Sequence, residues 1–374
     1  MPEILETAES YLKALVVPNA IVIDRDSAVL QWALSGLGER QLLGLRLSRE
    51  WGGTGVSAST FNQFQELVAQ YSGALAFLQT QHQSAGAMLL QSKNEALKQA
   101  YLPHMSTGKK LVGIGFSHLR RSPPSLLAEQ VPDGYRLNGK VPWVTGFGYF
   151  QTFLAAAALP DGRAVFGMVP FTDQATAPAA SGLAQSNQAA DGFIRFSEPF
   201  SLAAMAATNT VQAEFENWFL ADEQVVMVRP PRWIEENDRR NVLRPAFLPL
   251  GCARAGLEIV AASRKRETLT FIDEALQQLN GELTMCRDRI LQLQTQSTVD
   301  FAQALAARSH AIDLAVRCAQ AAIAVSSGAA NSAEHPAQRV YREALVWMVS
   351  GQTPPLMAAT LNRLTSDASP KAEE

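Results

Sequence analysis

The sequence has few cysteines, no long uninterrupted apolar run and little net charge, and each of these absences excludes a class of protein. Its three cysteines, Cys252, Cys286 and Cys318, lie far apart and suggest neither a disulfide framework nor a Cys-x-x-Cys metal motif. Apolar runs stay below the roughly 18 residues that a membrane span needs, and the first nine residues are acidic, unlike a signal peptide. We therefore expect a cytoplasmic protein with no membrane segment.

Several chemistries lack their sequence signals. A formal net charge of −3 leaves no surplus of Lys and Arg for neutralising phosphates, so no nucleic-acid partner is expected. Gly113 and Gly115 begin like a dinucleotide fingerprint, but His118 stands where the third glycine is required. The five histidines show no metal-ligand spacing on one element, and no elbow motif presents a nucleophilic serine. No metal is expected.

Length and composition indicate a large globular protein. With 374 residues, 47% of them hydrophobic and 18% charged, the chain is long enough for two or three domains with sizeable cores. Residues 51–55 (WGGTG) contain three glycines and cannot be a helix interior. From Phe61 onwards, apolar residues recur at steps of three and four, the period of one buried helical stripe: Phe64, Leu67, Val68, Tyr71, Leu75 and Leu78.

The middle third has the pattern of strands. Residues 164–169 (AVFGMV) form a short β-rich run, and the Pro-Asp-Gly of residues 132–134 is a turn signal. Alternation at period two, the mark of a half-buried strand, is found at Val211, Ala213 and Phe215. We predict a central antiparallel β domain, a barrel or sandwich, over residues 113–229.

The last third returns to a helical period, and a late helix is expected over residues 336–348. A helical N-terminal domain (residues 1–112), the β domain and a C-terminal four-helix bundle (residues 230–374) make an α+β fold that is mainly α. Apolar residues of the bundle follow a coiled-coil-like seam that must face other helices: Leu269, Ile272, Leu276, Leu279, Leu283, Cys286, Ile290 and Leu293.

Four motifs placed in the right order resemble the acyl-CoA dehydrogenase family over almost the whole chain. Residues 51–55 resemble its Tyr-Gly-Gly-x-Gly turn, and residues 101–103 (YLP) before Gly108 are similar to its entry to the β domain. Residues 133–146 (DGYRLNGKVPWVTG) resemble a strand pair of the family, and residues 335–344 (HPAQRVYREA) resemble the start of a late helix. The resemblance implies an acyl-CoA dehydrogenase-like fold.

The resemblance also implies FAD as the cofactor, with its isoalloxazine ring between the β domain and the bundle and an acyl thioester against the ring. By position, Trp143 would pack on the ring and Thr145 would hydrogen-bond near its N5 atom. Phe116, Ser117 and Thr353 are the other expected cofactor-binding residues. A flavin needs a flat apolar wall and a few fixed donors, and Trp, Thr and Ser on neighbouring strands supply both.

One loop departs from the family pattern. Where the family usually has TEpxaGSD, with small residues that let backbone amides approach the ligand, this chain has SHLRRSPP at residues 117–124. The basic residues of this loop either form a new contact to an anion or are simply solvated. His118 is our candidate there for substrate binding, and Arg244, which the resemblance places near the substrate, is the second.

The catalytic base is a larger departure. A dehydrogenase of this type needs a carboxylate opposite the ring to remove an α-proton from the thioester. The position where most of the family has this glutamate is Gly351, and the other known position is Leu243. Glu258 and Glu343 are conceivable substitutes if the alignment slips, although Glu343 is expected to cap or pair structurally, as the matching aspartate does. The base is therefore unidentified.

The ADP half of the cofactor has weaker support. The family's RxxFG motif, which reaches a neighbouring subunit's pyrophosphate, has no clear match, since Arg266 and Phe271 stand at the wrong spacing. Its Gln-x-x-Gly-Gly segment is reduced to residues 326–328 (SSG). We infer a lower cofactor affinity or a different hold on the pyrophosphate.

Three hypotheses follow. The first is an FAD-dependent oxidoreductase that forms an α,β double bond in an acyl-CoA, with flavin N5 accepting the hydride. The second is a flavin-dependent monooxygenase of the same fold, which reacts with oxygen and needs no carboxylate opposite N5. The third is a catalytically silent flavin-binding relative. The expected partners are an acyl-CoA or another organic substrate, an electron acceptor or flavin reductase, and further copies of the chain in a homodimer or homotetramer.

Overall fold

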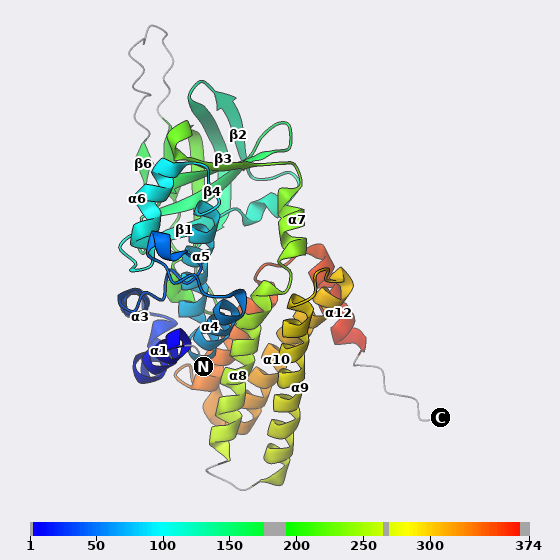
Figure 1. Ribbon diagram of the computed structural model, residues 1–374. Coiled ribbons are helices and arrows are strands. Elements are labelled where there is room, and N and C mark those ends of the chain that lie inside the picture. The colour runs from blue at the N-terminus through cyan, green and yellow to red at the C-terminus, as the bar shows by residue number, and fades with distance from the viewer. Residues whose placement is uncertain (1–2, 176–191, 265–268, 367–374) are drawn as a thin grey trace.

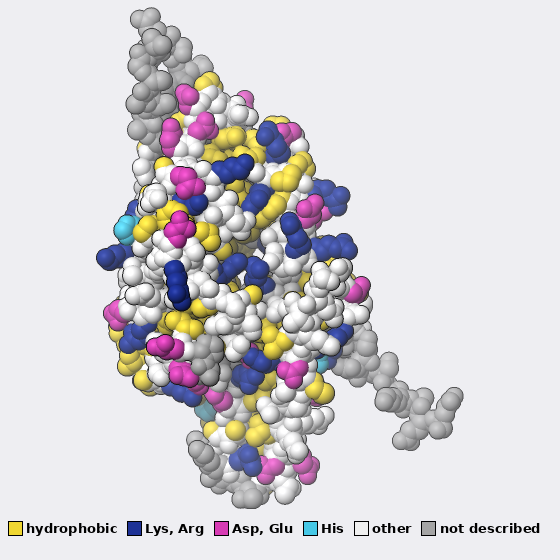
Figure 2. Space-filling view, in the orientation of Figure 1, with side chains coloured by type: hydrophobic (Ala, Val, Ile, Leu, Met, Phe, Trp, Pro, Cys, Tyr) yellow, Lys and Arg dark blue, Asp and Glu magenta, His cyan; other side chains and the backbone are white. Residues whose placement is uncertain are grey.

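The computed structural model describes residues 3–175, 192–264 and 269–366. Figure 1 shows the β domain at the top, a bundle of long helices below it and the N-terminal helices along one side of both. The predicted fold class, an α+β chain with N-terminal helices, a β domain and a C-terminal helical bundle, is confirmed. On the face shown in Figure 2, Lys and Arg side chains gather where the β domain meets the bundle.

The N-terminal region is helical, and polar side chains mark where its helices begin. Ser57, for example, accepts a hydrogen bond from the N–H of Thr60 at the start of α4. Gly52 and Gly55 have φ angles of +74° and +57°, so residues 51–55 form a turn, as predicted. The helices are α1 (Glu3–Tyr11), α2 (Ala20–Ile23), α3 (Ser27–Glu39), α4 (Ala58–Tyr71), α5 (Gly73–Leu89) and α6 (Glu95–Met105).

The single apolar stripe predicted from Phe61 onwards belongs to two helices. The chain is extended at Ser72 (φ −158°, ψ 113°), so α4 ends before it. The Ser72 hydroxyl accepts a hydrogen bond from the N–H of Leu75 at 3.3 Å and so begins α5. The period located the buried face correctly, because Phe64, Val68, Tyr71, Leu75 and Leu78 are all buried, but it did not reveal the break.

The described strands form one sheet in the order β6-β7-β8-β3-β2-β4-β5-β9, with β1 beside β4. Neighbours are antiparallel, except that β1 and β2 run parallel to β4, so the predicted antiparallel domain is antiparallel in the main. The turn predicted at residues 132–134 joins β2 to β3, with Asp133 at φ +60°. The strands are β1 (Val112–Gly115), β2 (Leu126–Val131), β3 (Gly134–Val144), β4 (Thr152–Ala158), β5 (Ala164–Pro170), β6 (Gln174–Ala175), β7 (Phe193–Phe196), β8 (Val211–Ala221) and β9 (Val225–Arg229).

The C-terminal helices surround the predicted seam. Along α9 the seam residues from Leu279 to Leu293 are buried against α8 and α10, whereas Leu269 precedes the helix and is exposed. The late helix predicted over residues 336–348 is α11. The helices are α7 (Trp233–Arg240), α8 (Phe247–Ser263), α9 (Thr270–Gln294), α10 (Phe301–Ser326), α11 (Pro336–Val349) and α12 (Pro354–Ser366).

Helix α8 is the central helix of the bundle. By length and composition Arg244–Ser263 is long and apolar enough to cross a membrane, with a mean hydropathy of 1.3, but 67% of that window is buried within the fold. Glycines let its neighbours touch it: a Cβ on Gly251 would lie 2.2 Å from the Glu66 carbonyl of α4, and one on Gly256 would lie 2.6 Å from the Cys318 carbonyl of α10. We therefore read α8 as a core helix.

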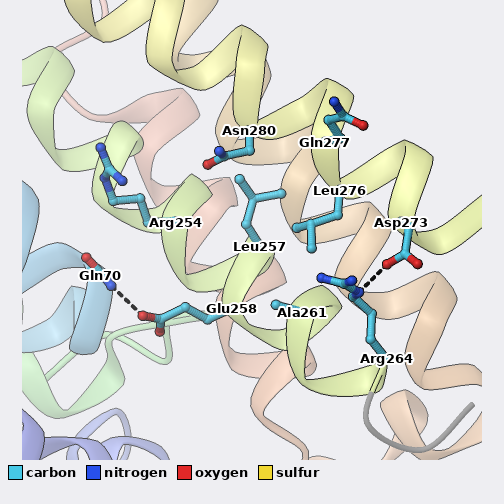
Figure 3. Close-up of a pocket in the computed structure, with 10 residues that line it drawn as sticks. All are labelled: Gln70, Arg254, Leu257, Glu258, Ala261, Arg264, Asp273, Leu276, Gln277 and Asn280. Carbon is cyan, nitrogen blue, oxygen red and sulfur yellow. Dashed lines mark hydrogen bonds and ion pairs between the residues drawn. The ribbon is translucent and has the colours of Figure 1, made fainter. Parts of the chain in front are cut away.

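A groove of about 530 Å³ runs between α4, α8 and α9 (Figure 3). Two polar pairs cross it: Gln70 donates to Glu258 at 2.5 Å, and Arg264 pairs with Asp273. Its lining combines apolar side chains with amides and charged groups. The remaining lining residues are Arg254, Leu257, Ala261, Leu276, Gln277 and Asn280.

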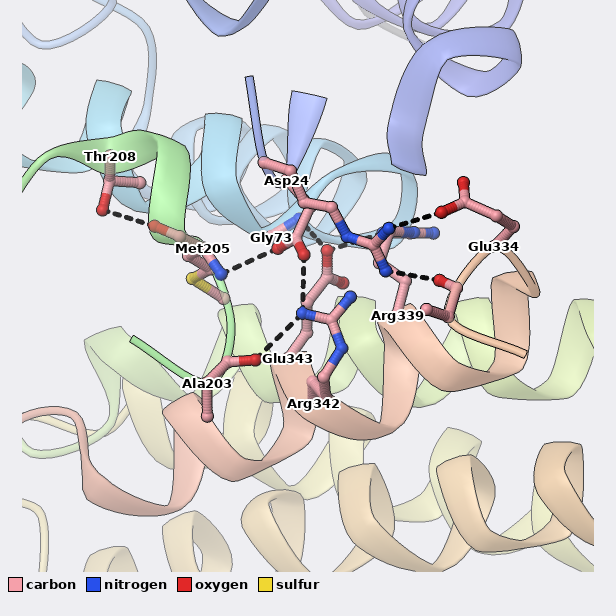
Figure 4. Close-up of polar contacts among 11 residues, drawn as sticks. Asp24, Gly73, Ala203, Met205, Thr208, Glu334, Arg339, Arg342 and Glu343 are labelled. Carbon is pink, nitrogen blue, oxygen red and sulfur yellow. Dashed lines mark hydrogen bonds and ion pairs between the residues drawn. The ribbon is translucent and has the colours of Figure 1, made fainter. Parts of the chain in front are cut away.

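A buried carboxylate on α11 joins the bundle to the N-terminal helices (Figure 4). Glu343 is fully buried; its Oε1 accepts the N–H of Gly73 at 3.0 Å and pairs with Arg339 Nη1 at 2.6 Å. Burial raises the pKa of Glu343 above its usual value, and the guanidinium beside it acts in the opposite direction. The expectation that Glu343 serves structurally is confirmed, and its carboxylate already has these partners.

A second buried carboxylate extends the network to the β domain (Figure 4). Asp24 accepts the N–H of Met205 at 2.7 Å through one oxygen and pairs with Arg342 Nη1 at 2.7 Å through the other. Arg342 also donates to the carbonyl of Ala203 at 2.9 Å. The N-terminal helices, the β domain and α11 are therefore held together by charged hydrogen bonds to two buried carboxylates.

His82 ties α5 to the entry of the β domain. The ring is fully buried, its Nδ1 accepts the N–H of Val112 at 3.1 Å, and its Nε2 lies 3.0 Å from the carbonyl of Met105. Since Nδ1 accepts, Nε2 must carry the proton of a neutral ring. Burial lowers the pKa of His82 to about 4. Protonation would break the bond to Val112.

We expect Glu343→Ala to destabilise the protein by about 3–5 kcal/mol, because it leaves the buried Arg339 without its partner. The matched control is Glu334→Ala, whose carboxylate is 72% exposed in its pair with Arg25 and should cost less than about 1 kcal/mol. Urea unfolding followed by circular dichroism measures both. Equal losses in the two variants would show that the network does not hold the domains.

The protein should lose stability as the pH falls from about 6.5 to about 4, because over this range His82 is protonated in the unfolded chain but stays neutral in the folded protein. Between pH 7.5 and 5 this group alone should cost about 2 kcal/mol. Unfolding in urea at both pH values should show a shallower dependence in His82→Gln, whereas the exposed control His104→Gln should match the wild type. An unchanged slope in His82→Gln would contradict this assignment.

Candidate functional site

Trp143 is a large aromatic side chain that the β domain leaves on its surface. It is 48% exposed and meets the ring of Phe200 edge-on at 5.0 Å between centroids. A β-bulge explains the exposure: the register between β3 and β8 shifts between Val141 and Val144, and both of these residues point into the core. A bulge adds one residue to a strand and redirects the neighbouring side chain.

Thr145 follows the bulge directly, and its hydroxyl lies beside the hydroxyl of Thr210. Its side chain is 7% exposed, and its Oγ1 lies 3.0 Å from the Oγ1 of Thr210. The backbone here is fixed by the N–H of Gly146, which donates to the carbonyl of Thr208 at 2.9 Å. Two adjacent hydroxyls can pass one hydrogen bond between them and present a further donor or acceptor.

Phe116 and Ser117 connect β1 to a short 3₁₀ turn, η4 (Ser117–Arg120), which lies beside β3 and β4. Ser117 is exposed, whereas Phe116 is half-buried and meets Phe166 and Trp233 edge-on. Ser117 therefore has a free surface for a ligand, while Phe116 packs under the turn. The cofactor contacts of both residues remain predictions.

His118 does not lie where a substrate contact requires it. The side chain is 1% exposed, and its Nε2 lies 2.9 Å from the carbonyl of Ala156 on β4. Burial lowers the pKa of His118 to about 4, so the ring is neutral at pH 7. Nothing in this position supports the predicted substrate contact, because the η4 turn directs the imidazole into the protein.

Arg120 of the same turn has a structural partner. Its guanidinium forms a bidentate pair with Asp238 of α7, at 2.6 and 2.7 Å. This pairing fixes the loop that departs from the family pattern against the first helix of the C-terminal region. Arg121 is exposed, and nothing in the structure assigns it a ligand.

The position expected for a catalytic glutamate lies on a turn with left-handed backbone. Gly351 has φ +64°, and a Cβ there would lie 3.0 Å from Nη2 of Arg308. Arg308, on α10, is buried and donates to the carbonyls of Ser350 and Gly351, both at 3.2 Å, and to that of Val242 at 3.4 Å. Burial lowers its pKa to about 10. The guanidinium of Arg308 thus lies beside Gly351, the position where most of the family has its catalytic glutamate.

The alternative carboxylates do not reach this turn. Glu343 is held within the buried network by Gly73 and Arg339. Glu258 lines the groove of Figure 3, where burial raises its pKa. It follows Arg244 by 14 residues (258 − 244), which is roughly 20 Å along a helix. Leu243, at the other known base position, is a buried apolar residue.

Arg244 and Thr353 flank the two turns that Arg308 joins. Arg244 begins a 3₁₀ turn, η7 (Arg244–Ala246), and keeps much of its surface exposed. Thr353 is partly buried, and its Oγ1 accepts the N–H of Leu356 at 3.4 Å, which places it at the start of α12. The ligand contacts expected of both residues remain predictions.

Of the residues expected near the ADP half, Ser326 ends α10. Arg266 lies outside the described residues, and Phe271 on α9 is exposed. Ser327 has φ +52°, so residues 326–328 turn there. In the part of the chain that the structure describes, no group of three or more His, Cys, Asp or Glu side chains could hold a metal ion.

Sequence reasoning missed Arg308, although a signal was present. A helical face buried at Ala304, Ala311 and Ala315 includes position 308, and a charged residue on such a face needs partners inside the protein. Its partners could not be foreseen, because Val242 and Gly351 approach α10 only in the folded chain. The flavin roles expected of Trp143, Thr145 and Ser117 from the motif remain predictions.

Comparisons with known proteins agree with this architecture. Residues 2–109 match the family model of the acyl-CoA dehydrogenase N-terminal domain. The rat mitochondrial very long-chain specific acyl-CoA dehydrogenase is 28% identical over 185 residues, which cover 45% of this chain and 28% of that protein. The curated relatives are matched over 28% to 52% of their own length.

Solved structures share the fold over nearly the whole chain. Butyryl-CoA dehydrogenase from Megasphaera elsdenii superposes with a TM-score of 0.78 at 17% identity, covering 97% of both chains. A glutaryl-CoA dehydrogenase from Mycobacterium smegmatis in complex with FADH2 gives a TM-score of 0.79 at 15% identity, covering 98% of this chain and 95% of that one. In its N-terminal domain, in its partial sequence matches and in its fold, this chain is similar to the acyl-CoA dehydrogenases.

Proposed function

We propose that this protein is an FAD-dependent oxidoreductase that acts on an acyl thioester, in the manner of the acyl-CoA dehydrogenases. The observation that supports this best is the exposed indole of Trp143 beside the buried hydroxyl pair of Thr145 and Thr210. An apolar aromatic face and a fixed hydroxyl donor are what a flavin ring requires, so these residues fit the cofactor. When bound, FAD would supply a two-electron acceptor for a hydride from the β-carbon.

In this proposal the protein's residues bind and orient. Trp143 packs against the ring, Thr145 donates a hydrogen bond to it, and the exposed hydroxyl of Ser117 lies within the same part of the β domain. Arg244 contacts the substrate. Phe116 supports the η4 turn from below through its aromatic neighbours.

Proton removal is the step that this chain must perform differently. A base has to accept the α-proton of the thioester, and the backbone at Gly351 and the guanidinium of Arg308 leave no carboxylate there. Glu343 and Glu258 are engaged elsewhere. The proposed reaction therefore proceeds without the usual glutamate, with a base that these residues do not identify.

A flavin-dependent monooxygenase is the second candidate, and one observation favours it: a buried cation, Arg308, underlies the position where a dehydrogenase needs an anion. Anaerobic mixing of the FAD-loaded protein with a panel of acyl-CoAs separates the two reactions. Loss of the flavin's visible absorbance supports the dehydrogenase. Loss only with an external flavin reductase supports the monooxygenase.

We also propose that the protein is a cytoplasmic homo-oligomer that passes electrons to a separate acceptor. Exposed apolar side chains on the C-terminal helices support self-association, since such surfaces usually meet a partner; they include Phe271, Met285, Tyr341, Leu345, Val349 and Leu361. The three free, buried cysteines are compatible with a reducing compartment.

Trp143→Ala should weaken FAD binding by about 10- to 100-fold, because it removes the aromatic wall against which the ring would pack. Trp32→Ala is the matched control, since Trp32 is 44% exposed on α3 and should not affect the cofactor. Titration of the apoprotein with FAD, followed by flavin fluorescence, gives both dissociation constants. The same affinity in both variants would refute the proposed cofactor site.

Gly351→Glu should not create a faster dehydrogenase. A side chain at φ +64° is strained by about 1–2 kcal/mol. The new carboxylate would also pair with Arg308, and this pairing would keep the pKa of the carboxylate too low for a good base. Gly351→Ala controls for the backbone strain. Anaerobic flavin reduction by acyl-CoA measures the rate, and a clear gain in Gly351→Glu over both the wild type and Gly351→Ala would contradict this reasoning.

A further inference from the structure

A cavity of about 530 Å³ lies between α6 and the strands β5 and β8 of the β domain. The two strands face each other here, since a Cβ on Gly167 would lie 2.4 Å from a side-chain carbon of Leu220. Trp218, which lines the cavity, is opposite Leu137 of β3, and Leu137 precedes Trp143 by six residues (143 − 137), roughly 20 Å along a strand. The cavity is therefore separate from the proposed flavin site.

The lining of this cavity is mostly apolar and carries little charge. Leu97 and Tyr101 of α6 close one side, and Met168 of β5 lies among the residues of the other. Glu223 is the one charged residue among the described residues that line it. Lys110 lies 4.6 Å from the centroid of the Tyr101 ring but is not part of the lining. The cavity therefore suits a neutral ligand better than an anion.

Two residues of the lining carry a polar atom without a partner. The indole Nε1 of Trp218 and the hydroxyl oxygen of Thr152 are both buried, and neither has a hydrogen-bond partner in the part of the chain that the structure describes. Trp218 is only 3% exposed. Its N–H can donate but not accept, and buried donors in proteins nearly always have an acceptor. The acceptor that Trp218 lacks must therefore come from a molecule in the cavity.

A β-bulge directly precedes Trp218. The register between β3 and β8 shifts between Leu137 and Gly139, and Asn217 has a φ angle of +51°. A bulge redirects the neighbouring side chain and is common beside binding sites. The same pair of strands has its other register shift beside Trp143. Each of the two bulges thus determines the position of one tryptophan, at opposite ends of the strand pair.

We propose that this cavity binds a neutral, largely apolar small molecule whose carbonyl oxygen accepts a hydrogen bond from Nε1 of Trp218. A carbonyl oxygen has two lone pairs, so the ligand can also use the hydroxyl of Thr152 as a donor. Leu97, Tyr101 and Met168 would cover the apolar part of the molecule. The carboxylate of Glu223 would repel an anion. This site goes beyond the proposed function and does not depend on the flavin.

Titration with three small probes tests the site, followed by NMR of protein with isotope-labelled indole nitrogens. Acetophenone carries the carbonyl, α-methylstyrene has the same shape with a methylene group in place of the oxygen, and benzoate carries a negative charge. The indole resonance of Trp218 is assigned by its absence in Trp218→Phe. It should move further downfield with acetophenone than with α-methylstyrene, because only the ketone accepts a hydrogen bond. Benzoate should bind more weakly than acetophenone.

Trp218→Phe removes the donor and keeps an aromatic ring. The affinity for acetophenone relative to α-methylstyrene, measured by ligand-observed NMR, should fall by about 5- to 10-fold, because both probes lose the same apolar contacts and only the ketone loses a hydrogen bond. Thr152→Val removes the second donor at nearly constant shape and decides the question where Trp218→Phe does not fold. Trp32→Phe is the matched control, since Trp32 is 44% exposed on α3 and should leave this ratio unchanged.

Four results would overturn the proposal. The first is a Trp218 resonance that does not move up to the solubility limit of acetophenone, and the second is an equal shift with α-methylstyrene. The third is a ratio of affinities that matches the wild type in both Trp218→Phe and Thr152→Val. The fourth is benzoate binding as tight as that of acetophenone, because it would contradict the neutral charge assigned to the ligand.

Discussion

The structure depends on two buried carboxylates that arginines of one helix hold in place. Glu343, which pairs with Arg339, accepts the N–H of Gly73 at the N-terminus of α5, while Arg342 joins α11 to Asp24 and, through it, to Met205 of the β domain. Separating such groups would strand charges away from water, which costs far more than the pairs contribute when formed. Because the chain passes directly from α11 into the turn at Gly351, this network also determines where that turn lies relative to the β domain.

The position of the turn at Gly351 determines which charged group lies beside it. The turn at Gly351 would present a base in most of the family, but here it presents two carbonyls to the buried guanidinium of Arg308. The guanidinium of Arg308 thus places a positive charge beneath this turn, where its nitrogens donate to backbone carbonyls. The β domain supplies complementary features, an aromatic face at Trp143 and a hydroxyl pair at Thr145.

Much of the architecture was predictable from local patterns. The seam from Leu279 to Leu293 is buried, the strand at residues 164–169 is present in β5, and the 51–55 turn depends on the positive φ angles of its glycines. These features follow from periodicity and backbone sterics, which act over a few residues. Sequence-based prediction failed where the burial or the local backbone of a residue depended on contacts distant in the chain. Ser72 interrupts a continuous stripe, and His118 turns inward to Ala156 although it lies in a loop rich in charge.

The sequence by itself determined the order of helices and strands, the residues of the proposed flavin wall and the absence of glutamate at position 351, because each of these is a matter of residue type and spacing. Only the tertiary structure decided that Arg308 would lie beneath that position and that Arg120 would pair with Asp238. Electrostatic pairing joins residues far apart in the chain, and burial sets its strength, so it is decided only when the three parts come together.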